Sequence, residues 1–425
     1  MGEHVFCGFG FGPIQGGLFA AEAFQSGNFS RIVVAEIDRQ LVEAVKANNG
    51  SYCVNVAKAD GIESLKIDNV ELLDPNIPQD RKLLTEVLSR STEIVTCLPS
   101  VNFYESGGAN SVASLIAKGL RQSEARGTII YTAENNNHAA ETLEKLVAGT
   151  VGGSLPANVQ FLNTVIGKMS RVVDDPAEIA QLKLKTIAPG IERAFLVEWF
   201  NRILVSRTRI AGFTPGIEVF IEKDDLLPFE EAKLYAHNAV HSLLGFVGSV
   251  KGCTAMTQLK DDPAIMQIAR DAFLTECGPA LIEKHGALSD ELFTEAGFKD
   301  YADDLLERMT NPYLADTVAR AGRDAVRKLG VNDRIFGTMQ LAAEYGIEPR
   351  NMAIDAIAGI AVLIEQAEQY NLPADLRFDD WRKLSGVEVE AILNWAWRGQ
   401  ACRHTAEILE GVLPARGGLQ RLIGQ

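Results

Sequence analysis

The 425-residue chain has only six cysteines and no long apolar run. The cysteines are scattered, no CxxC pair occurs, and no cysteine–histidine cluster has the spacing of a zinc site. A chain of this length needs no disulfide framework, so we expect free thiols in a reducing compartment. No run of about 20 apolar residues marks a membrane span, and glycines, a proline and a glutamine interrupt the stretch 4–22 where a signal peptide would lie. These absences predict a cytoplasmic protein.

Basic residues are also in short supply. Acidic residues outnumber them by 56 to 41, which gives a formal net charge of −15. Nucleic acid is therefore not an expected partner, because neutralising its phosphates requires a basic surface. An anionic ligand would need a local basic pocket. We expect a small-molecule ligand and no membrane partner, while the oligomeric state stays open.

The pattern of apolar residues divides the chain into two regions. The first alternates short apolar runs with helical stretches, which predicts a parallel sheet. Strands are expected at 4–9, 31–38, 93–97, 128–132 and 159–166, with helices between them such as 110–120 and 138–148. The rest of the chain has helical periodicity throughout. The sequence thus predicts an α/β protein, with a Rossmann-type dinucleotide-binding domain over 1–222 and a mainly helical domain over 223–425.

A glycine-rich segment, GFGFGPIQGG at 8–17, separates the first strand from the first helix. In a dinucleotide-binding fold such glycines allow the backbone to approach a pyrophosphate at a helix N-terminus. Glu36, near the end of the second strand, would bind the ribose hydroxyls and repel a 2′-phosphate, so NAD is favoured over NADP. The segment is not a regular GxGxxG, and a tight turn that binds nothing also fits it.

Polar side chains follow two further strands of the expected sheet. Thr96 and Leu98 lie at the end of one, and Asn135 follows the next, within ENNNH at 134–138. Ligands gather at the carboxyl ends of parallel strands, so these residues are candidates for binding a cofactor. A helix-entry loop with asparagine caps would give the same pattern.

The segment KLYAHNAVH at 233–241 places several polar side chains on one helix. At about 100° per residue from Lys233, His241 falls near 80° and Asn238 near 140°, and His237 is not excluded. A lysine whose pKa is lowered by burial can take the proton of an alcohol, and an amide can hold the developing alkoxide without a metal. His241 could orient the substrate. A solvated helix face with a core histidine is the alternative.

The spacing K-x4-N-x2-H at 233–241 resembles the signature of the polyol-specific long-chain dehydrogenases, the mannitol dehydrogenase family. The stretches 311–335 and 344–361 look most like its mannitol-1-phosphate 5-dehydrogenase branch. The resemblance implies an NAD-dependent, metal-independent oxidoreductase of carbohydrate metabolism. It implies that Lys233 is the general base and that His241 binds substrate hydroxyls. Asn238 would be half of an oxyanion pair, and AEN at 133–135 matches the family's C-D-N or C-E-N motif, which makes Asn135 the other half.

Two departures from the family pattern concern the loop and the substrate. The family's GAGNIGRG is GFGPIQGG here, which lacks the central glycine and keeps Gly10, Gly12, Ile14 and Gly17. Ser170 stands where the family has an aspartate in V-D-R-I, and this change leaves the exact substrate open.

Five basic residues lie close together in the second region: Arg320, Arg323, Arg327, Lys328 and Arg334. On one uninterrupted helix the four arginines would share a face and could hold a phosphate or carboxylate, although a solvated basic face fits equally. By resemblance, Arg320 and Lys328 match a pair that contacts substrate in non-phosphate mannitol enzymes. Arg323 and Arg327 are the extra charges of the phosphate branch, and they favour a phosphorylated substrate.

The sequence therefore predicts an NAD-dependent enzyme that interconverts a secondary alcohol of a sugar alcohol, or of its phosphate, with the ketone. A reductase of hexuronates or unphosphorylated ketoses is the alternative enzyme. A non-catalytic NAD(H)-binding protein is the alternative of another class.

Overall fold

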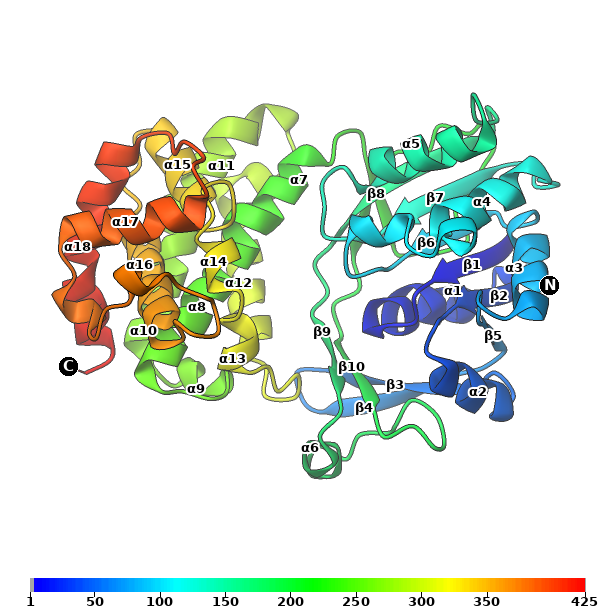
Figure 1. The fold of residues 1–425 in the computed structure, drawn as a ribbon, viewed down its shortest axis with the longest axis horizontal. Helices are drawn as coiled ribbons and strands as arrows, with labels where there is room; N and C mark the ends of the chain where they lie inside the picture. The colour runs from blue at the N-terminus through cyan, green and yellow to red at the C-terminus, as the bar shows by residue number, and fades with distance from the viewer. Residues whose placement is uncertain (1–3, 425) are drawn as a thin grey trace. The chain divides into compact units, whose positions relative to one another are not determined.

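The computed structural model describes residues 4–424, which fall into two compact units, Met1–Leu227 and Pro228–Gln425. The first unit contains every strand, and the second is helical (Figure 1).

The main sheet of the first unit has eight strands in the order β12-β11-β8-β7-β6-β1-β2-β5. The run from β8 to β5 is parallel, whereas β11 pairs with β8 antiparallel and β12 runs with β11. The chain leaves β1 to one side and returns on the other at β6, so the strand order reverses between β1 and β6. The strands are β1 His4–Phe9, β2 Phe29–Ala35, β5 Val70–Leu73, β6 Glu93–Thr96, β7 Thr128–Thr132, β8 Val159–Ile166, β11 Ile203–Ser206 and β12 Phe220–Lys223.

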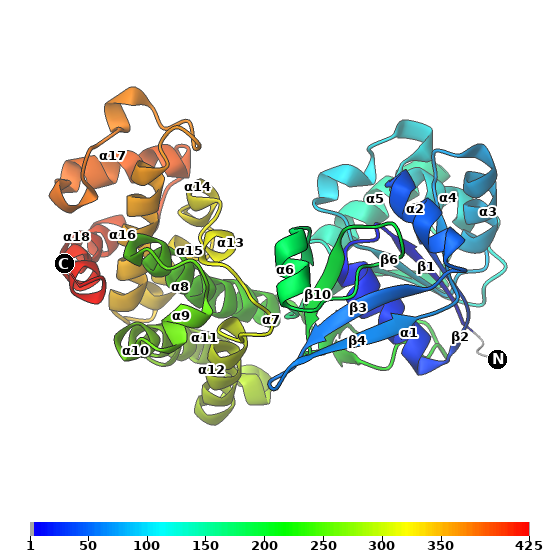
Figure 2. The ribbon, with the colours of Figure 1, turned by 90° about the horizontal axis from the view of Figure 1, so that it is seen from below.

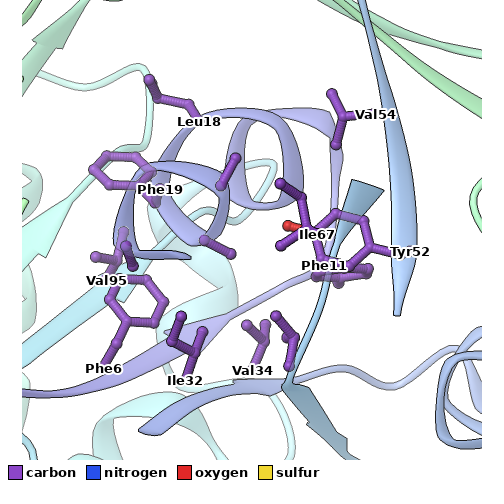
Figure 3. Packing of buried hydrophobic residues seen from close by; sticks show 14 of the residues in the cluster. Phe6, Phe11, Leu18, Phe19, Ile32, Val34, Tyr52, Val54, Ile67 and Val95 are labelled. Atoms are coloured by element: carbon purple, nitrogen blue, oxygen red, sulfur yellow. The ribbon is translucent and has the colours of Figure 1, made fainter. Parts of the chain in front are cut away.

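Helices cover both faces of this sheet because successive strand residues alternate between two apolar layers. On β2, Ile32 and Val34 join one layer and Val33 joins the other. Figure 3 shows part of the first layer, where Phe6, Ile32 and Val34 pack beneath Leu18 and Phe19. That layer is covered by the π-helical turn η1 Gln15–Phe19, α1 Ala20–Ser26 and α2 Arg39–Ala47, and the opposite layer by α3 Pro78–Leu88, α4 Val112–Arg121 and α5 Ala139–Val151.

A second sheet has the order β4-β3-β10-β9 and packs through β3 and β10 against η1. Figure 2 shows β3, β4 and β10 on the side of the unit that carries α1. Its strands are β3 Tyr52–Ala57, β4 Ile62–Ile67, β9 Ser170–Val173 and β10 Ala194–Glu198, followed along the chain from β9 by α6 Pro176–Gln181. Short 3-10 turns, η2 Val101–Tyr104 and η3 Gly108–Asn110, follow β6.

The helical unit is built around α16, Arg350–Glu365, which is buried on nearly all sides from Met352 to Ile364. Helices α8, α14 and α18 pack on it. A helix that is apolar all round belongs in a core. The elements before α16 are α7 Leu227–Ala232, η4 Lys233–His237, α8 Asn238–Lys251, α9 Thr257–Lys260, α10 Pro263–Asp271, η5 Ala272–Cys277, α11 Gly278–His285, η6 Gly286–Leu288, η7 Glu291–Phe293, α12 Glu295–Met309, α13 Val318–Ala321, α14 Ala325–Lys328 and α15 Phe336–Glu344; after it come η8 Ala374–Leu376, η9 Trp381–Lys383, α17 Gly386–Trp397 and α18 Thr405–Leu422.

The predicted fold class, an α/β first region and a helical second region, is confirmed. All five expected strands are present within a few residues of their expected bounds. The sequence did not predict strands β11 and β12 or the second sheet, because most of these strands are only partly buried and so lack the continuous apolar runs of buried parallel strands. The six cysteines are free, and no helix within residues 4–424 is long and apolar enough to cross a membrane.

Candidate functional site

The glycine loop lies at the end of β1, where the strand order reverses. Gly10 has a φ of +79°, and its N–H donates to the carbonyl of Ala35 at 2.9 Å. A Cβ on Gly10 would lie 2.8 Å from the carbonyl oxygen of Cys97, so both the backbone conformation and the space require glycine. A Cβ on Gly12 would meet no described atom within 4 Å. The loop therefore leaves open space at the position where a dinucleotide fold receives a pyrophosphate.

The Glu36 carboxylate fixes this loop to the end of β2. Its Oε2 accepts from the Phe11 N–H at 2.6 Å, and its Oε1 accepts from the N–H groups of Ile37 and Asp38 at 2.7 and 2.8 Å. A carboxylate has about four acceptor positions, so one remains on Oε2. Glu36 can thus hold the loop and still accept one hydroxyl.

Gln15 occupies the place of the missing central glycine. Its side chain is fully buried, and neither amide atom has a hydrogen-bond partner among the described residues. Gly8 makes room for it, because a Cβ on Gly8 would lie 1.7 Å from Gln15 Nε2. The close helix–sheet approach that the central glycine usually permits occurs instead at Gly17, where a Cβ would lie 2.5 Å from Val197 on β10. Ile14 packs at the edge of the same core.

Glu134 connects the ends of β6 and β7. Its carboxylate accepts from Thr96 Oγ1 at 2.9 Å, from the Leu98 N–H at 2.8 Å and from the Tyr104 hydroxyl at 2.5 Å. Burial raises the pKa of Glu134 against the effect of these donors. Asn135 follows directly and is exposed. The side chain of Thr96 and the backbone of Leu98 therefore support Asn135 through Glu134, a role that the sequence analysis did not identify.

Ser170 begins β9 in the second sheet and pairs with Val197 on β10. It is partly exposed, and its neighbour Arg171 forms a two-pronged ion pair with Glu178 at 3.1 and 2.5 Å. Ser170 thus lies on the second sheet, where its pairing partner Val197 packs against Gly17 of the glycine loop.

In the helical unit, the segment that carries Lys233 is not a regular α-helix. Lys233–His237 form a π-helical turn, and the N–H of Asn238 donates to the carbonyl of Lys233. One i→i+5 turn therefore separates Lys233 from Asn238, which brings Asn238 nearer to the lysine's side of the helix than the roughly 140° that α-helical geometry would give. Burial lowers the pKa of Lys233 to about 8, with a further contribution from Arg334 and an opposing one from Glu230.

His241, one turn beyond Asn238, belongs to a buried charged group with Asp316 and Arg320. Asp316 Oδ2 lies 3.2 Å from His241 Nε2, and its Oδ1 accepts from Arg320 Nε at 2.8 Å. Burial would raise the pKa of Asp316, but the contacts with His241 and Arg320 hold it at about 2. Burial lowers the pKa of His241 despite Asp316. His241 is thus neutral at neutral pH and held by a carboxylate, while Arg320 shares the same acid.

Lys328 is buried and lies over the Phe246 ring, with its Nζ donating to the carbonyl of Ala321. Burial, together with Arg334, lowers its pKa to about 7. Asp355 on α16 is fully buried; its Oδ2 accepts from Ser242 at 2.8 Å, and burial raises its pKa. A substrate-binding role for Lys328 would require its ammonium to reach past this buried position.

The basic cluster is not on one helix. Asp324, with φ +60°, separates α13 from α14, so the four arginines do not share a continuous face. Arg323 is 66% exposed and 3.9 Å from Asp324, and Arg327 lies 3.5 Å from Asp324 and 3.4 Å from Asp333. The condition of one uninterrupted helix is not met, because the backbone breaks at Gly322 and Asp324. Aspartates also balance much of the charge.

Two acids were not identified by sequence reasoning: Glu134 in the first unit and Asp316 in the helical unit. Glu134 precedes Asn135, and Asp316 lies four residues before Arg320, a spacing that brings opposite charges together. No group of three metal-binding side chains occurs in the part of the chain that the structure describes.

Comparison with known proteins identifies relatives by sequence similarity. The family model of the mannitol dehydrogenase C-terminal domain matches residues 225–386. A protein of Paenarthrobacter aurescens (strain TC1) named mannitol-1-phosphate 5-dehydrogenase is 30% identical over 73% of this chain and 73% of its own length. A protein of the same name from Aureobasidium melanogenum is 28% identical, with 80% of this chain and 81% of that protein covered.

Solved structures show the same fold at lower identity. Pseudomonas fluorescens mannitol 2-dehydrogenase, in a ternary complex with NAD and D-mannitol, aligns with a TM-score of 0.73 at 16% identity, covering 100% of this chain and 94% of that chain. A substrate-free D-sorbitol dehydrogenase aligns with a TM-score of 0.76 at 16% identity, covering 98% of this chain and 94% of that chain.

Proposed function

This chain belongs to the mannitol dehydrogenase family, and we propose that it is an NAD-dependent polyol dehydrogenase that interconverts a secondary alcohol with its ketone. The observation that carries the proposal is the π-helical turn that brings Asn238 toward the side of Lys233, with His241 about one turn beyond. The relatives named mannitol-1-phosphate 5-dehydrogenase support a sugar alcohol or its phosphate as substrate.

The residues at the glycine loop fit NAD. The open space at Gly12 would receive the pyrophosphate beside the start of η1, and the remaining acceptor position of Glu36 would take a ribose hydroxyl. When bound, NAD supplies the acceptor for the hydride of the alcohol carbon. Glu134 would keep Thr96, Leu98 and Asn135 in place at the neighbouring strand ends.

In alcohol oxidation, Lys233 takes the hydroxyl proton and becomes an ammonium. Its pKa of about 8 leaves an appreciable fraction of neutral amine near neutral pH, as a base requires. Asn238 and Asn135 donate to the substrate oxygen, which stabilises its developing charge. Neutral His241, held by Asp316, orients a neighbouring hydroxyl. No residue of this set needs a metal.

The charge of the substrate depends on the basic residues of the helical unit. A phosphate would be bound by Arg323 and Arg327, with Arg320 and Lys328 nearer the polyol, and Ser170 would replace the family's acid as a hydroxyl contact. A second candidate, an unphosphorylated ketose, is supported by Asp324 and Asp333, which already balance those arginines. A hexuronate, the other alternative, would need only one of the arginines for its single carboxylate.

The test is NADH absorbance with fructose 6-phosphate, fructose or a hexuronate, each beside the Lys233→Ala variant. The expected result is that NADH is oxidised with fructose 6-phosphate alone, and that the Lys233→Ala variant does not oxidise it. Oxidation with fructose or the hexuronate would keep the catalytic group and select that alternative substrate. Equal rates in the variant, or no oxidation with any of the three, would refute the proposed function.

A further inference from the structure

We propose that Arg334 is a positioning residue of this enzyme, whose fixed positive charge beside the π-helical turn keeps Lys233 in the neutral, proton-accepting form. The inference rests on the proposed function, because it concerns the same base. It assigns a role to a buried arginine that the reaction itself does not use.

The backbone around Arg334 is fastened to the turn that carries Lys233. The hydroxyl of Thr338 lies 2.5 Å from the carbonyl oxygen of Arg334 and 3.0 Å from that of Tyr235, which is within the turn. A Cβ on Gly337 would lie 2.5 Å from the Tyr235 ring. Glycine at 337 therefore lets the first turn of α15 approach η4 closely, and Thr338 fixes the contact.

The guanidinium of Arg334 is buried in this contact. Its side chain is 8% exposed, and Nε donates to Asp333 Oδ1 at 2.8 Å. The other oxygen of Asp333 lies 3.4 Å from Arg327. Arg327 also faces Asp324, which it shares with Arg323. Three guanidinium groups thus face two carboxylates, which cannot neutralise all three. A net positive charge remains on this side of Lys233.

The charged groups around this contact oppose one another. Arg334 disfavours a charge on Lys233, whereas Glu230 on α7 favours it. His237 interacts with Lys233, Arg334, His241 and Arg308, and burial lowers its pKa well below the usual range, so it adds no charge at neutral pH. Burial lowers the pKa of Arg334 below the usual arginine value, Asp333 and Asp355 oppose this effect, and Arg327 adds to it. An arginine keeps its proton where a buried lysine does not. Of the two groups, Lys233 is therefore the one that loses its proton.

Two other roles for Arg334 give different results. A purely structural ion pair with Asp333 would affect folding but not the protonation of Lys233. A substrate ligand would affect KM but not the pH at which the base titrates. The pH profile therefore separates the three roles.

The experiment measures two pH profiles for the full-length protein. One is kcat/KM for polyol oxidation with NAD. The other is acetylation of Lys233 by acetic anhydride, followed by mass spectrometry. The reagent can reach Lys233 because its side chain is partly exposed, and the labelling does not depend on turnover. The variants are Arg334→Gln, Arg334→Lys and Asp333→Asn, and the control is Arg350→Gln, which removes an arginine whose side chain is 75% exposed.

Arg334→Gln is expected to move both inflections up by about one pH unit, which corresponds to roughly tenfold less activity at pH 7 with an unchanged alkaline plateau. Arg350→Gln should leave the inflections in place. Arg334→Lys should move them up part of the way, because a buried lysine gives up its proton more readily than an arginine. Asp333→Asn should move them down, because Arg334 then lacks its acid. A structural role predicts no opposite shifts.

Unmoved inflections in folded Arg334→Gln, or in Asp333→Asn if the first variant does not fold, would overturn the inference. A raised KM with unmoved inflections would do the same and make Arg334 a substrate ligand. If no polyol is oxidised but the labelling inflection moves, the proposed function fails and the electrostatic role stands. If Lys233-dependent turnover occurs without a shift, only the inference fails.

Discussion

The candidate sites of the two units consist of different kinds of chemical group. The first unit uses backbone: Gly10 in a left-handed conformation, open space at Gly12, and loop N–H groups gathered by Glu36. The helical unit uses charged side chains, which are largely buried and paired around Lys233 and His241. Backbone conformation is fixed by local sequence, whereas a charge depends on groups far along the chain. The first kind of site should tolerate changes of charge and fail on changes of shape, and the second should do the reverse.

The largest effect is expected from Lys233→Ala, which separates the two sites. Removal of the base should lower kcat by about 10²- to 10⁴-fold, while NADH affinity should stay within about twofold because the glycine loop belongs to the other unit. Steady-state kinetics and NADH fluorescence titration measure the two quantities. A parallel loss of NADH binding would contradict the division of labour.

Gly10→Ala is the reverse experiment. A side chain at φ +79° costs about 1–2 kcal/mol, and its Cβ would press on the Cys97 carbonyl. NADH affinity should fall about tenfold or more, and the free energy of unfolding should also fall. The acetylation profile of Lys233 should not move.

Two other glycines sharpen this result. Gly12→Ala should weaken NADH binding without loss of stability, since its Cβ enters open space, and Gly61→Ala, also in open space, should change neither. Unaltered NADH binding in Gly10→Ala and Gly12→Ala together would show that the loop is only a turn.

The local geometry of the first candidate site follows more directly from the sequence than that of the second. The order of strand, glycines, helix and acid identified Gly10 and Glu36, because each step depends on neighbouring residues. The long-range contacts were not visible: Glu134 with Tyr104, and the second sheet that receives Gly17, depend on residues 30 or more positions away.

In the helical unit, the residue types were visible but their geometry was not. Lys233, Asn238 and His241 were selected by spacing, yet the π-helical turn changed their relative positions. The arginine cluster was visible as charge, whereas the break at Asp324 and the compensation by Asp333 were not. Helical periodicity assumes regular geometry, and it fails where an extra residue enters a turn.

Asp316→Asn is expected to have an intermediate effect. His241 and Arg320 would lose their shared carboxylate, so kcat/KM should fall about 10- to 100-fold, mainly through KM. The low folded pKa of Asp316, about 2, also stabilises the protein at pH values above its unfolded value of 3.8, and this contribution fades as the pH falls toward 2. The variant should therefore lose stability at pH 7 and little of it near pH 2.

The control for this variant is Glu43→Gln, because Glu43 and Arg39 form an exposed pair with the same i,i+4 spacing. Exposed pairs contribute about 0–1 kcal/mol, so the control should change neither KM nor stability measurably. Equal effects of the two substitutions would mean that Asp316 has no special role at the site.

The smallest effect is expected at Gln15, where a buried polar side chain lies within a site formed mainly by backbone groups. A polar side chain is buried in the glycine-loop helix, and its amide atoms have no partner among the described residues. A buried unpaired polar group costs about 1–3 kcal/mol, so Gln15→Met, which keeps the side-chain length, should raise the free energy of unfolding by about 1 kcal/mol. Gln25→Met, on the exposed surface of α1, should change it by less than about 0.5 kcal/mol. Urea unfolding measures both. A loss of stability in Gln15→Met would show that the amide is hydrogen-bonded in solution, so that this loop depends on a side-chain partner as the site of the helical unit does.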